Sequence, residues 1–155
     1  MKFMMNGALT IGTRDGATIE MAEEAGSENF FLFGLTAQQV ADSADWYDPN
    51  WHYAHEPETR VALDLIGSDH FSRYEPGVFR PILNTLLAEG DRFRHLADLT
   101  DYARAHRELS ALYEDADAWA GKAIINLACS GKFSSDRTII EYANDIWNMQ
   151  PSPVE

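Results

Sequence analysis

Two short apolar runs near the start of the chain, residues 8–11 and 29–34, constrain its fold more than any other feature. Glycines bound both runs, and neither alternates between apolar and polar residues, which is the pattern of strands buried on both faces. Residues 17–25 between them have the composition of a short helix that stops at Gly26. A strand, a helix and a second strand in this order predict a parallel βαβ unit.

Two strands of this kind do not make a stable sheet alone. Parallel strands that are apolar throughout need further strands at their edges and helices on both faces. We therefore expect the additional neighbours to come from residues preceding Met1 or from another chain.

The rest of the sequence is predicted to be mostly helical. Thr36 is a suitable N-cap for a helix over residues 37–44, and residues 47–50 form a turn. Residues 92–98 alternate briefly and are predicted to be extended, and Thr138 and Glu141 have the spacing of a capping box. Further helices are expected at 57–66, 79–87, 100–113 and 116–129 and after Ser134, with Tyr102, Tyr113, Ile124 and Leu127 among the inward residues.

The predicted fold class is thus α/β, with two short parallel strands followed by a mostly helical remainder. Residues 1–150 form the folded part, and residues 151–155, which contain Pro151 and Pro153, form a disordered tail. We find no repeat, low-complexity tract or linker that would divide the chain.

Charge and cysteine content exclude several classes of function. A formal net charge of −13 argues against binding nucleic acid or an anionic membrane by bulk electrostatics. The single cysteine, Cys129, rules out an internal disulfide and suits a reducing compartment. Because no apolar run approaches the length of a membrane span, we expect a cytoplasmic location without membrane association.

Three other groups of residues suggest chemistry but have simpler interpretations. His52, His55 and Glu56 lack the spacing and the third ligand that a zinc site needs, so no metal site is predicted. Cys129 falls on the apolar side of a predicted helix and is expected to be a buried, unreactive thiol. Residues 131–137 lack the spaced glycines of a phosphate-binding loop, and their serines are expected to cap a helix.

The first residues of the chain are more informative. Residues 1–17 read MKFMMNGALTIGTRDGA, with Lys2 in an apolar, methionine-rich turn that Asn6 and Gly7 break. On burial habits alone a lysine near the N-terminus is a solvated surface residue. The order of the residues around Lys2 indicates more than that.

This stretch resembles the pyridoxal-phosphate lysine segment of the α-glucan phosphorylases, M-K-F-M-x-N-G-A-L-T-I-G-T-x-D-G-A, at every fixed position. The resemblance continues in the same order along nearly the whole chain. It includes Glu28 to Gly34, the pair Phe71-Ser72, the run Phe79-Arg80-Pro81, Leu112-Tyr113 with Trp119, the run Ser130 to Ile139, and Tyr142-Ala143 with Ile146-Trp147.

The resemblance implies a fold and a function. Residues 1–150 would be the C-terminal portion of the second, cofactor-binding domain of a Rossmann-like (GT-B type) glycosyltransferase, and the parent enzyme would be a homodimer. Lys2 would bind pyridoxal 5'-phosphate through its ε-amine and so be both the catalytic and the cofactor-binding residue. The reaction would be reversible phosphorolysis, by orthophosphate, of terminal α-1,4-glucosidic bonds of glycogen, starch or maltodextrin, giving α-glucose 1-phosphate.

In that family a Gly-Thr-Gly-Asn run and basic residues that hold phosphate precede the lysine, and here nothing precedes Met1. We therefore expect a piece of a longer enzyme, from a partial reading frame or a truncated product, that is inactive alone. The main alternative is a non-catalytic folding or interaction module that docks through its strand edges and aromatic helices. A pyridoxal-phosphate enzyme of amino-acid metabolism is a third possibility, but the lysine segments of those enzymes differ from this one.

Overall fold

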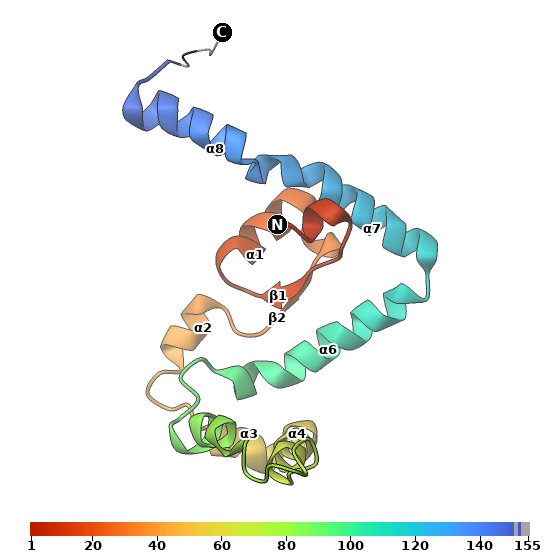
Figure 1. Ribbon diagram of the computed structural model, residues 1–155, viewed down its shortest axis with the longest axis vertical. Helices are drawn as coiled ribbons and strands as arrows, with labels where there is room; N and C mark the ends of the chain where they lie inside the picture. Colours follow the sequence, from red (N-terminus) through yellow and green to blue (C-terminus); the bar gives the residue numbers. More distant parts are fainter. Residues whose placement is uncertain (151, 153–155) are drawn as a thin grey trace.

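The computed structural model describes residues 1–150 and residue 152. The tail predicted for residues 151–155 lies outside the described residues, except for Ser152, which is exposed. The predicted architecture is confirmed, because two short parallel strands near the N-terminus are followed by a mostly helical remainder. The molecule is elongated and curved, with the sheet near its middle and the C-terminal helices at one end (Figure 1).

The sheet consists of β1 (Ile11–Thr13) and β2 (Phe31–Phe33), which pair in parallel with Ile11 opposite Phe31. Helix α1 (Gly16–Ala25) and a short 3-10 helix, η2 (Ser27–Asn29), connect them. Strand β1 lies later than the predicted residues 8–11. The N–H of Phe31 donates to the carbonyl of Thr10 at 3.0 Å, and the ladder begins there, so residues 8 and 9 lie before the strand.

The two longest helices flank the sheet. In Figure 1, α6 (His95–Tyr113) and α7 (Ala116–Cys129) form the arms of a V, with the two strands and α1 between them. Strand β2 contacts α6, and the rings of Phe33 and Tyr102 meet edge to face with centroids 5.1 Å apart. Asp115 begins α7 by accepting a hydrogen bond from the N–H of Ala118 at 3.0 Å. The second arm, α7, contacts α1 and the N-terminal segment.

A small core lies where α1, β2, α7 and the N-terminal segment meet. Its buried members are Met4, Met21, Ala22, Ala25 and Phe30. Leu32, Cys129 and Phe133 pack against this group from its edge. Cys129 is therefore half-buried rather than fully buried as predicted. Burial of this apolar surface is the main stabilising term that holds the N-terminal segment in place.

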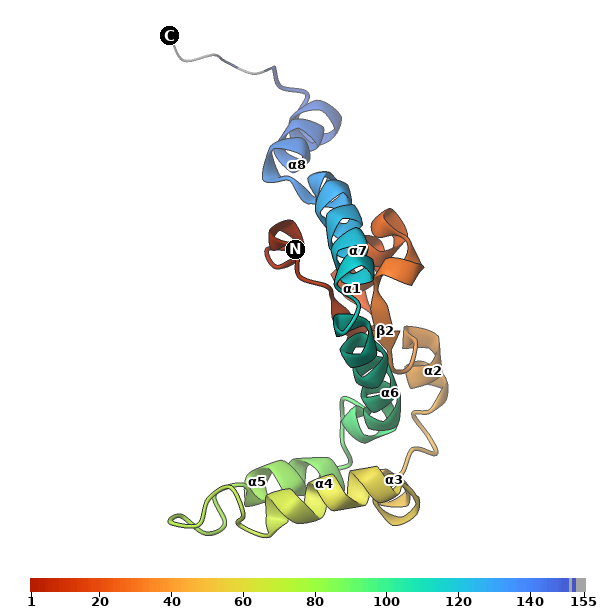
Figure 2. The ribbon, with the colours of Figure 1, turned by 90° about the vertical axis from the view of Figure 1, so that its right-hand side faces the viewer.

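A second group of helices projects to one side of the long axis (Figure 2). The turn predicted at residues 47–50 is instead the start of helix α3, because Asp48 accepts from the N–H of Asn50 and Pro49 occupies the first turn. Thr36 and Gln39 form a reciprocal capping box at the start of α2, which confirms Thr36 as an N-cap. The group comprises α3 (Pro49–His55), α4 (Pro57–Gly67), α5 (Arg80–Leu83) and a π-helical turn, η3 (Asn84–Ala88). Helix α2 (Ala37–Asp42) lies outside this group, on the opposite side of the long axis in Figure 2.

Residues 92–98 are not extended, since α6 begins at His95. The buried carboxylate of Asp91 accepts hydrogen bonds from the N–H groups of His95 and Leu96 at 3.0 and 2.8 Å. Asp91 and Arg94 both have positive φ, so a tight reversal precedes the helix. Asp91 thus satisfies the first donors of α6 from outside the helix.

The C-terminal part is a 3-10 helix, η4 (Ser130–Phe133), then α8 (Ser135–Glu141) and a π-helical stretch, η5 (Tyr142–Trp147). The predicted capping box at Thr138 and Glu141 is absent, because Thr138 lies inside α8 and its hydroxyl donates back to the carbonyl of Ser134. Ser134 occupies the N-cap position of α8 without a side-chain capping bond.

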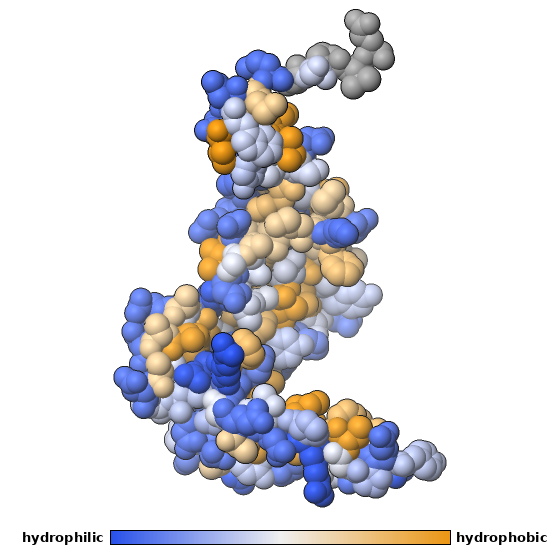
Figure 3. Space-filling model, turned by 60° about the vertical axis from the view of Figure 1, so that its left-hand side comes forward, coloured by the Kyte–Doolittle hydropathy of each residue, from blue (hydrophilic) through white to orange (hydrophobic). Residues whose placement is uncertain are grey.

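Several side chains predicted to point inward are exposed in this chain. Tyr102, Tyr113, Ile124 and Leu127 all retain more than a third of their surface. The same is true of Ile139, Ile140, Ile146 and Trp147 at the C-terminal end. Hydrophobic side chains consequently reach the surface along the length of the molecule (Figure 3).

Candidate functional site

The N-terminal segment that carries Lys2 is a closed turn rather than a free end. The N–H of Met5 donates to the carbonyl of Met1, and the N–H of Gly7 donates to the carbonyl of Met4, at 3.0 and 3.1 Å. The 3-10 helix η1 (Met4–Asn6) ends at Gly7, whose φ of 77° favours glycine. Lys2 is therefore fixed in the turn that leads into β1.

Asn6 holds the backbone of Lys2 directly. Its side-chain Nδ2 donates to the carbonyl oxygen of Lys2 at 2.7 Å. Asn6 and the turn at Gly7 thus both fix the backbone around Lys2.

Met4 attaches the segment to the rest of the molecule. Its side chain is 1% exposed and belongs to the core formed with Met21, Ala22, Ala25 and Phe30. Helix η1 also lies against α7. Sequence reasoning did not identify this role, because the partners of Met4 lie 17 to 26 residues away and a methionine-rich start gives no sign of which methionine is buried.

The surroundings of Lys2 are apolar and open. Lys2 is exposed, and its neighbours Met1, Phe3 and Met5 are 48%, 82% and 55% exposed. Large apolar side chains usually lose this surface to a partner or to another part of the protein. The described residues thus leave Lys2 and its apolar neighbours uncovered.

Within the described part of the chain, Lys2 is the lysine whose ammonium group is left available. Lys122 donates to the carbonyl of Glu28, and Lys132 forms an ion pair with Glu24. No carboxylate among the described residues lies within ion-pair distance of Lys2. The side chain of Lys2 is thus accessible, and its backbone is fixed.

The carboxyl ends of both strands open on a cavity of about 490 Å³, lined by Thr13, Leu35, Arg92, His95 and Asp98 among others. The N–H groups of Gly34 and Leu35, which follow β2, donate to the carboxylates of Asp101 and Asp98, each at 2.8 Å. Burial raises the pKa of Asp98, whereas a hydrogen bond from Arg104 lowers the pKa of Asp101. Both carboxylates of α6 therefore act in holding the end of β2.

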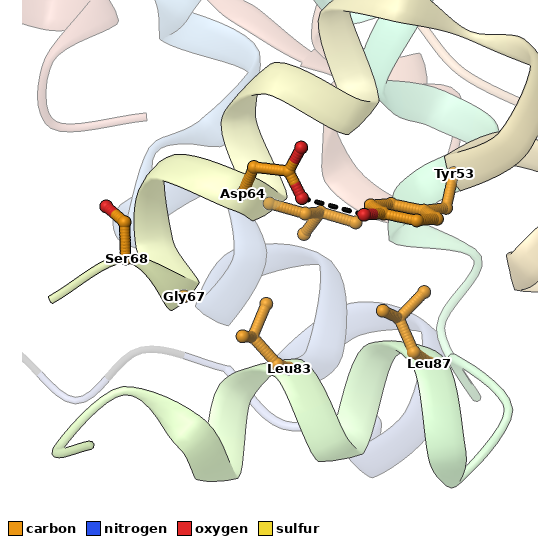
Figure 4. Close-up of a pocket in the computed structure, with 7 residues that line it drawn as sticks. Tyr53, Asp64, Gly67, Ser68, Leu83 and Leu87 are labelled. Atoms are coloured by element: carbon orange, nitrogen blue, oxygen red, sulfur yellow. Dashed lines mark hydrogen bonds between the residues drawn. The ribbon is translucent and has the colours of Figure 1, made fainter.

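A smaller cavity of about 350 Å³ lies between α4 and the α5–η3 segment (Figure 4). The hydroxyl of Tyr53 donates to Asp64 at 2.7 Å on one side, and Leu83 and Leu87 face it from the other. The hydroxyl of Ser68, which also lines it, donates to the carbonyl of Leu65. Because these polar side chains already have partners, the cavity is best explained as a packing gap between helices.

The residues that could suggest a metal site are used otherwise. His52 Nδ1 bonds to Glu56 at 2.9 Å, and His55 Nδ1 bonds to the carbonyl of Trp51 at 2.9 Å. Among the described residues, no group of three potential metal ligands comes together. Lys132 and Arg137 in the run 131–137 are likewise engaged, with Arg137 donating to the carbonyl of Lys132 and to Glu141.

Comparison with known proteins identifies the family. The family model for carbohydrate phosphorylase matches residues 1–149. Glycogen phosphorylase, brain form, from Homo sapiens is 50% identical over 156 residues, covering 100% of this chain and 18% of that protein. The muscle form from Homo sapiens is 49% identical over 154 residues (98% of this chain, 18% of that protein), and the liver form from Bos taurus is 48% identical over 156 (100% and 18%).

The chain therefore belongs to the carbohydrate phosphorylase family. It spans 18% of the length of these curated relatives. In residues 1–150 and 152, we find no helix with the length and hydrophobicity needed to cross a bilayer.

Proposed function

We propose that this chain is the cofactor-anchoring part of an α-glucan phosphorylase and that Lys2 binds pyridoxal 5'-phosphate. Family membership supports the class of enzyme. The observation that supports Lys2 is local: Asn6 and Met4 fix its backbone, while its amine bonds to no other described residue. Residues 1–150 would then form the C-terminal portion of the second, cofactor-binding domain.

Pyridoxal phosphate, when bound, supplies a phosphate group whose second pKa of about 6 allows proton exchange near neutral pH. The chain's own contribution is to hold and orient that group. Lys2 provides the attachment point, and the hydrogen bond from Asn6 limits the movement of the lysine backbone. The apolar side chains of Met1, Phe3 and Met5 would exclude water once another part of the enzyme covers them.

The reaction proposed for the whole enzyme is reversible phosphorolysis of terminal α-1,4-glucosidic bonds of glycogen, starch or maltodextrin. Orthophosphate is the second substrate, and α-glucose 1-phosphate is the product. The enzyme would work in glycogen catabolism in the cytoplasm, as a homodimer, without nucleic acid or membrane partners. The net charge of −13 supports the exclusion of polyanionic partners.

A chimera tests this proposal most sharply, with the chain replacing the matching region of the Homo sapiens brain form. The identity of 50% over the full length of the chain makes this exchange feasible. We expect phosphorolysis of maltoheptaose by the chimera, with activity abolished by Lys2→Arg and retained by the control Lys122→Arg. A folded chimera that is inactive, or one that keeps its activity with Lys2→Arg, would contradict the proposal.

The 155-residue chain alone should be inactive. Its described residues leave Lys2 open to solvent, and its two other lysines are engaged with Glu28 and Glu24. We expect no glucose 1-phosphate from the purified chain with glycogen, phosphate and pyridoxal phosphate. Product formation in this assay would show that the chain contains a complete site.

A non-catalytic interaction module is the second candidate. It is favoured by the exposed apolar side chains of α7 and α8, such as Ile124 at 65% and Ile139 at 56% exposed. Sedimentation of the purified chain distinguishes this function, because a module that docks through these faces should associate. A stable monomer at high concentration would count against it.

A further inference from the structure

A pocket of about 430 Å³ that takes no part in the Lys2 site lies at the start of α3. Its lining consists of Trp46, Tyr47, Asp48, Trp51 and His52. Four of these five side chains are aromatic, and the volume is within the usual range of small-molecule sites. Figures 1 and 2 place α3 in the side group of helices, well separated from the N-terminal segment.

The two tryptophan rings are held in place although they are exposed. Trp46 is 73% exposed, yet its Nε1 donates to the carbonyl of Asp42 at 2.9 Å. Trp51 is 52% exposed, and its ring stacks on His55 with centroids 4.8 Å apart and an interplanar angle of 20°. Because the rings are already ordered, a ligand that covers them loses little conformational entropy on binding.

The pocket also offers unused hydrogen-bonding atoms. One carboxylate oxygen of Asp48 accepts from the backbone and side chain of Asn50, which leaves the second oxygen available. Nδ1 of His52 bonds to Glu56, which leaves Nε2 available. A ligand with several hydroxyl groups can both donate to Asp48 and exchange a hydrogen bond with His52.

Charge and geometry select among ligands. An anionic ligand, such as a phosphate ester, would be repelled by the carboxylate of Asp48 in the lining. An organic cation needs rings that enclose it, and here the tryptophans are open surfaces, while Arg94 already lies 4.1 Å from the centroid of the Tyr47 ring. A neutral sugar ring, with an apolar C–H face and polar hydroxyl edges, matches both the open rings and the hydrogen-bonding atoms.

We propose that this aromatic pocket is a binding site for α-1,4-linked glucose oligosaccharides, separate from the Lys2 site. The identity of the sugar rests on the proposed function. Trp46 and Trp51 stack on the sugar rings, and Asp48 and His52 bind hydroxyl groups. Such a site keeps the enzyme on a glucan without taking part in phosphorolysis.

The chain contains four tryptophans, and their indole N–H signals provide the test. On titration of the ¹⁵N-labelled chain with maltoheptaose, the signals of Trp46 and Trp51 should shift, and those of Trp119 and Trp147 should not. Trp51→Ala should weaken binding at least about tenfold, which corresponds to about 1.4 kcal/mol, and so reduce the shift at Trp46 at a given concentration of maltoheptaose. The matched control Trp147→Ala, a ring that is 53% exposed, should leave binding unchanged.

Equal shifts in all four signals, no shift at Trp46 and Trp51, or shifts caused by tetramethylammonium but not by maltoheptaose would overturn the proposal. The chimera provides a second measurement, in which Trp51→Ala should reduce retardation in a glycogen-containing native gel and Trp147→Ala should not. Lys2→Ala should leave the indole shifts intact, and Trp51→Ala should leave the attachment of pyridoxal phosphate to Lys2 intact. Failure of one proposal is thus distinguishable from failure of the other.

Discussion

Three residues of the first seven determine where Lys2 sits, and each does so by a different physical effect. Met4 contributes buried apolar surface, Asn6 contributes a hydrogen bond to the Lys2 carbonyl, and Gly7 allows the left-handed conformation that closes the turn. None of these three contacts involves the side-chain amine of Lys2. The segment therefore combines a fixed backbone with an available functional group.

Replacement of Gly7 by alanine should destabilise the chain by about 1 kcal/mol, because a side chain at positive φ is strained. Urea denaturation followed by circular dichroism measures this effect. Gly121→Ala is the matched control, since Gly121 lies inside α7 and an added methyl group would contact nothing. That substitution should stabilise the chain by up to about 1 kcal/mol. Equal effects at the two positions would contradict the assigned role of Gly7.

Replacement of Met4 by alanine should cost about 2–3 kcal/mol, because it leaves a cavity beside Met21 and Phe30. Met5→Ala removes the same number of atoms from a side chain that is 55% exposed and should change stability little. The free energy of unfolding of the two variants decides this point. Similar values would show that η1 is not anchored through Met4.

At the scale of secondary structure, two carboxylates of α6 link this helix to the end of β2. Asp98 and Asp101 accept from the N–H groups of Leu35 and Gly34. Asp101 is also bonded to Arg104, with Nε and Oδ1 2.6 Å apart. These bonds use carboxylates to satisfy backbone donors that have no partner in the two-stranded sheet.

The pKa shifts of Asp98 and Asp101 predict that the two carboxylates change the stability of the fold with pH in opposite directions. The pKa of Asp101 is lowered in the folded state, so its stabilising effect is present above its ordinary pKa of 3.8 and is lost as the pH falls through the lowered value. Burial raises the pKa of Asp98, so protonation of Asp98 relieves a cost as the pH falls. Urea midpoints between pH 3 and 7 should therefore converge for wild type and Asp101→Asn on acidification. Compared with Asp98→Asn, the wild type should gain stability as the pH falls.

Comparison of sequence and structure shows which features of the fold can be predicted from residues close together in the sequence. The order of strand, helix and strand followed from apolar runs and glycines, and the Thr36 cap from side-chain chemistry. The start of β1 depends on where β2 begins to pair, and the start of α6 depends on Asp91 four residues earlier. The break at Asn6 and Gly7 was predictable because it is local, whereas the burial of Met4 and the aromatic pocket require knowledge of the tertiary structure.

At the scale of the whole molecule, the chain exposes much apolar surface for its size. Side chains of α7, α8 and η5 that follow a helical stripe are left uncovered, as are the residues around Lys2. The two-stranded sheet has no further strand within residues 1–150 and 152. Exposed apolar surface of this extent usually packs against a partner or another part of a protein, and the elongated shape in Figure 1 leaves it open.

Charged substitutions on these uncovered faces should reduce association without unfolding the chain. Ile124→Lys and Ile139→Lys affect side chains that are 65% and 56% exposed, and we expect stability changes within about 0.5 kcal/mol. Leu63→Lys is the contrasting variant, because Leu63 is 4% exposed and a lysine there should unfold α4. Light scattering against concentration, together with thermal unfolding, checks both expectations. Unfolding by the first two variants would show that these faces are covered in the chain itself.

The central claim is that Lys2 anchors the cofactor, and covalent mapping tests it most directly. The chain is incubated with pyridoxal phosphate, reduced with borohydride, digested and analysed by mass spectrometry. The three lysines, Lys2, Lys122 and Lys132, and the α-amine of Met1 compete for the label. The account predicts a strong preference for Lys2, weakened in Asn6→Ala and unchanged in Asn144→Ala, an exposed asparagine of η5. Labelling scattered evenly over the four amines would contradict it.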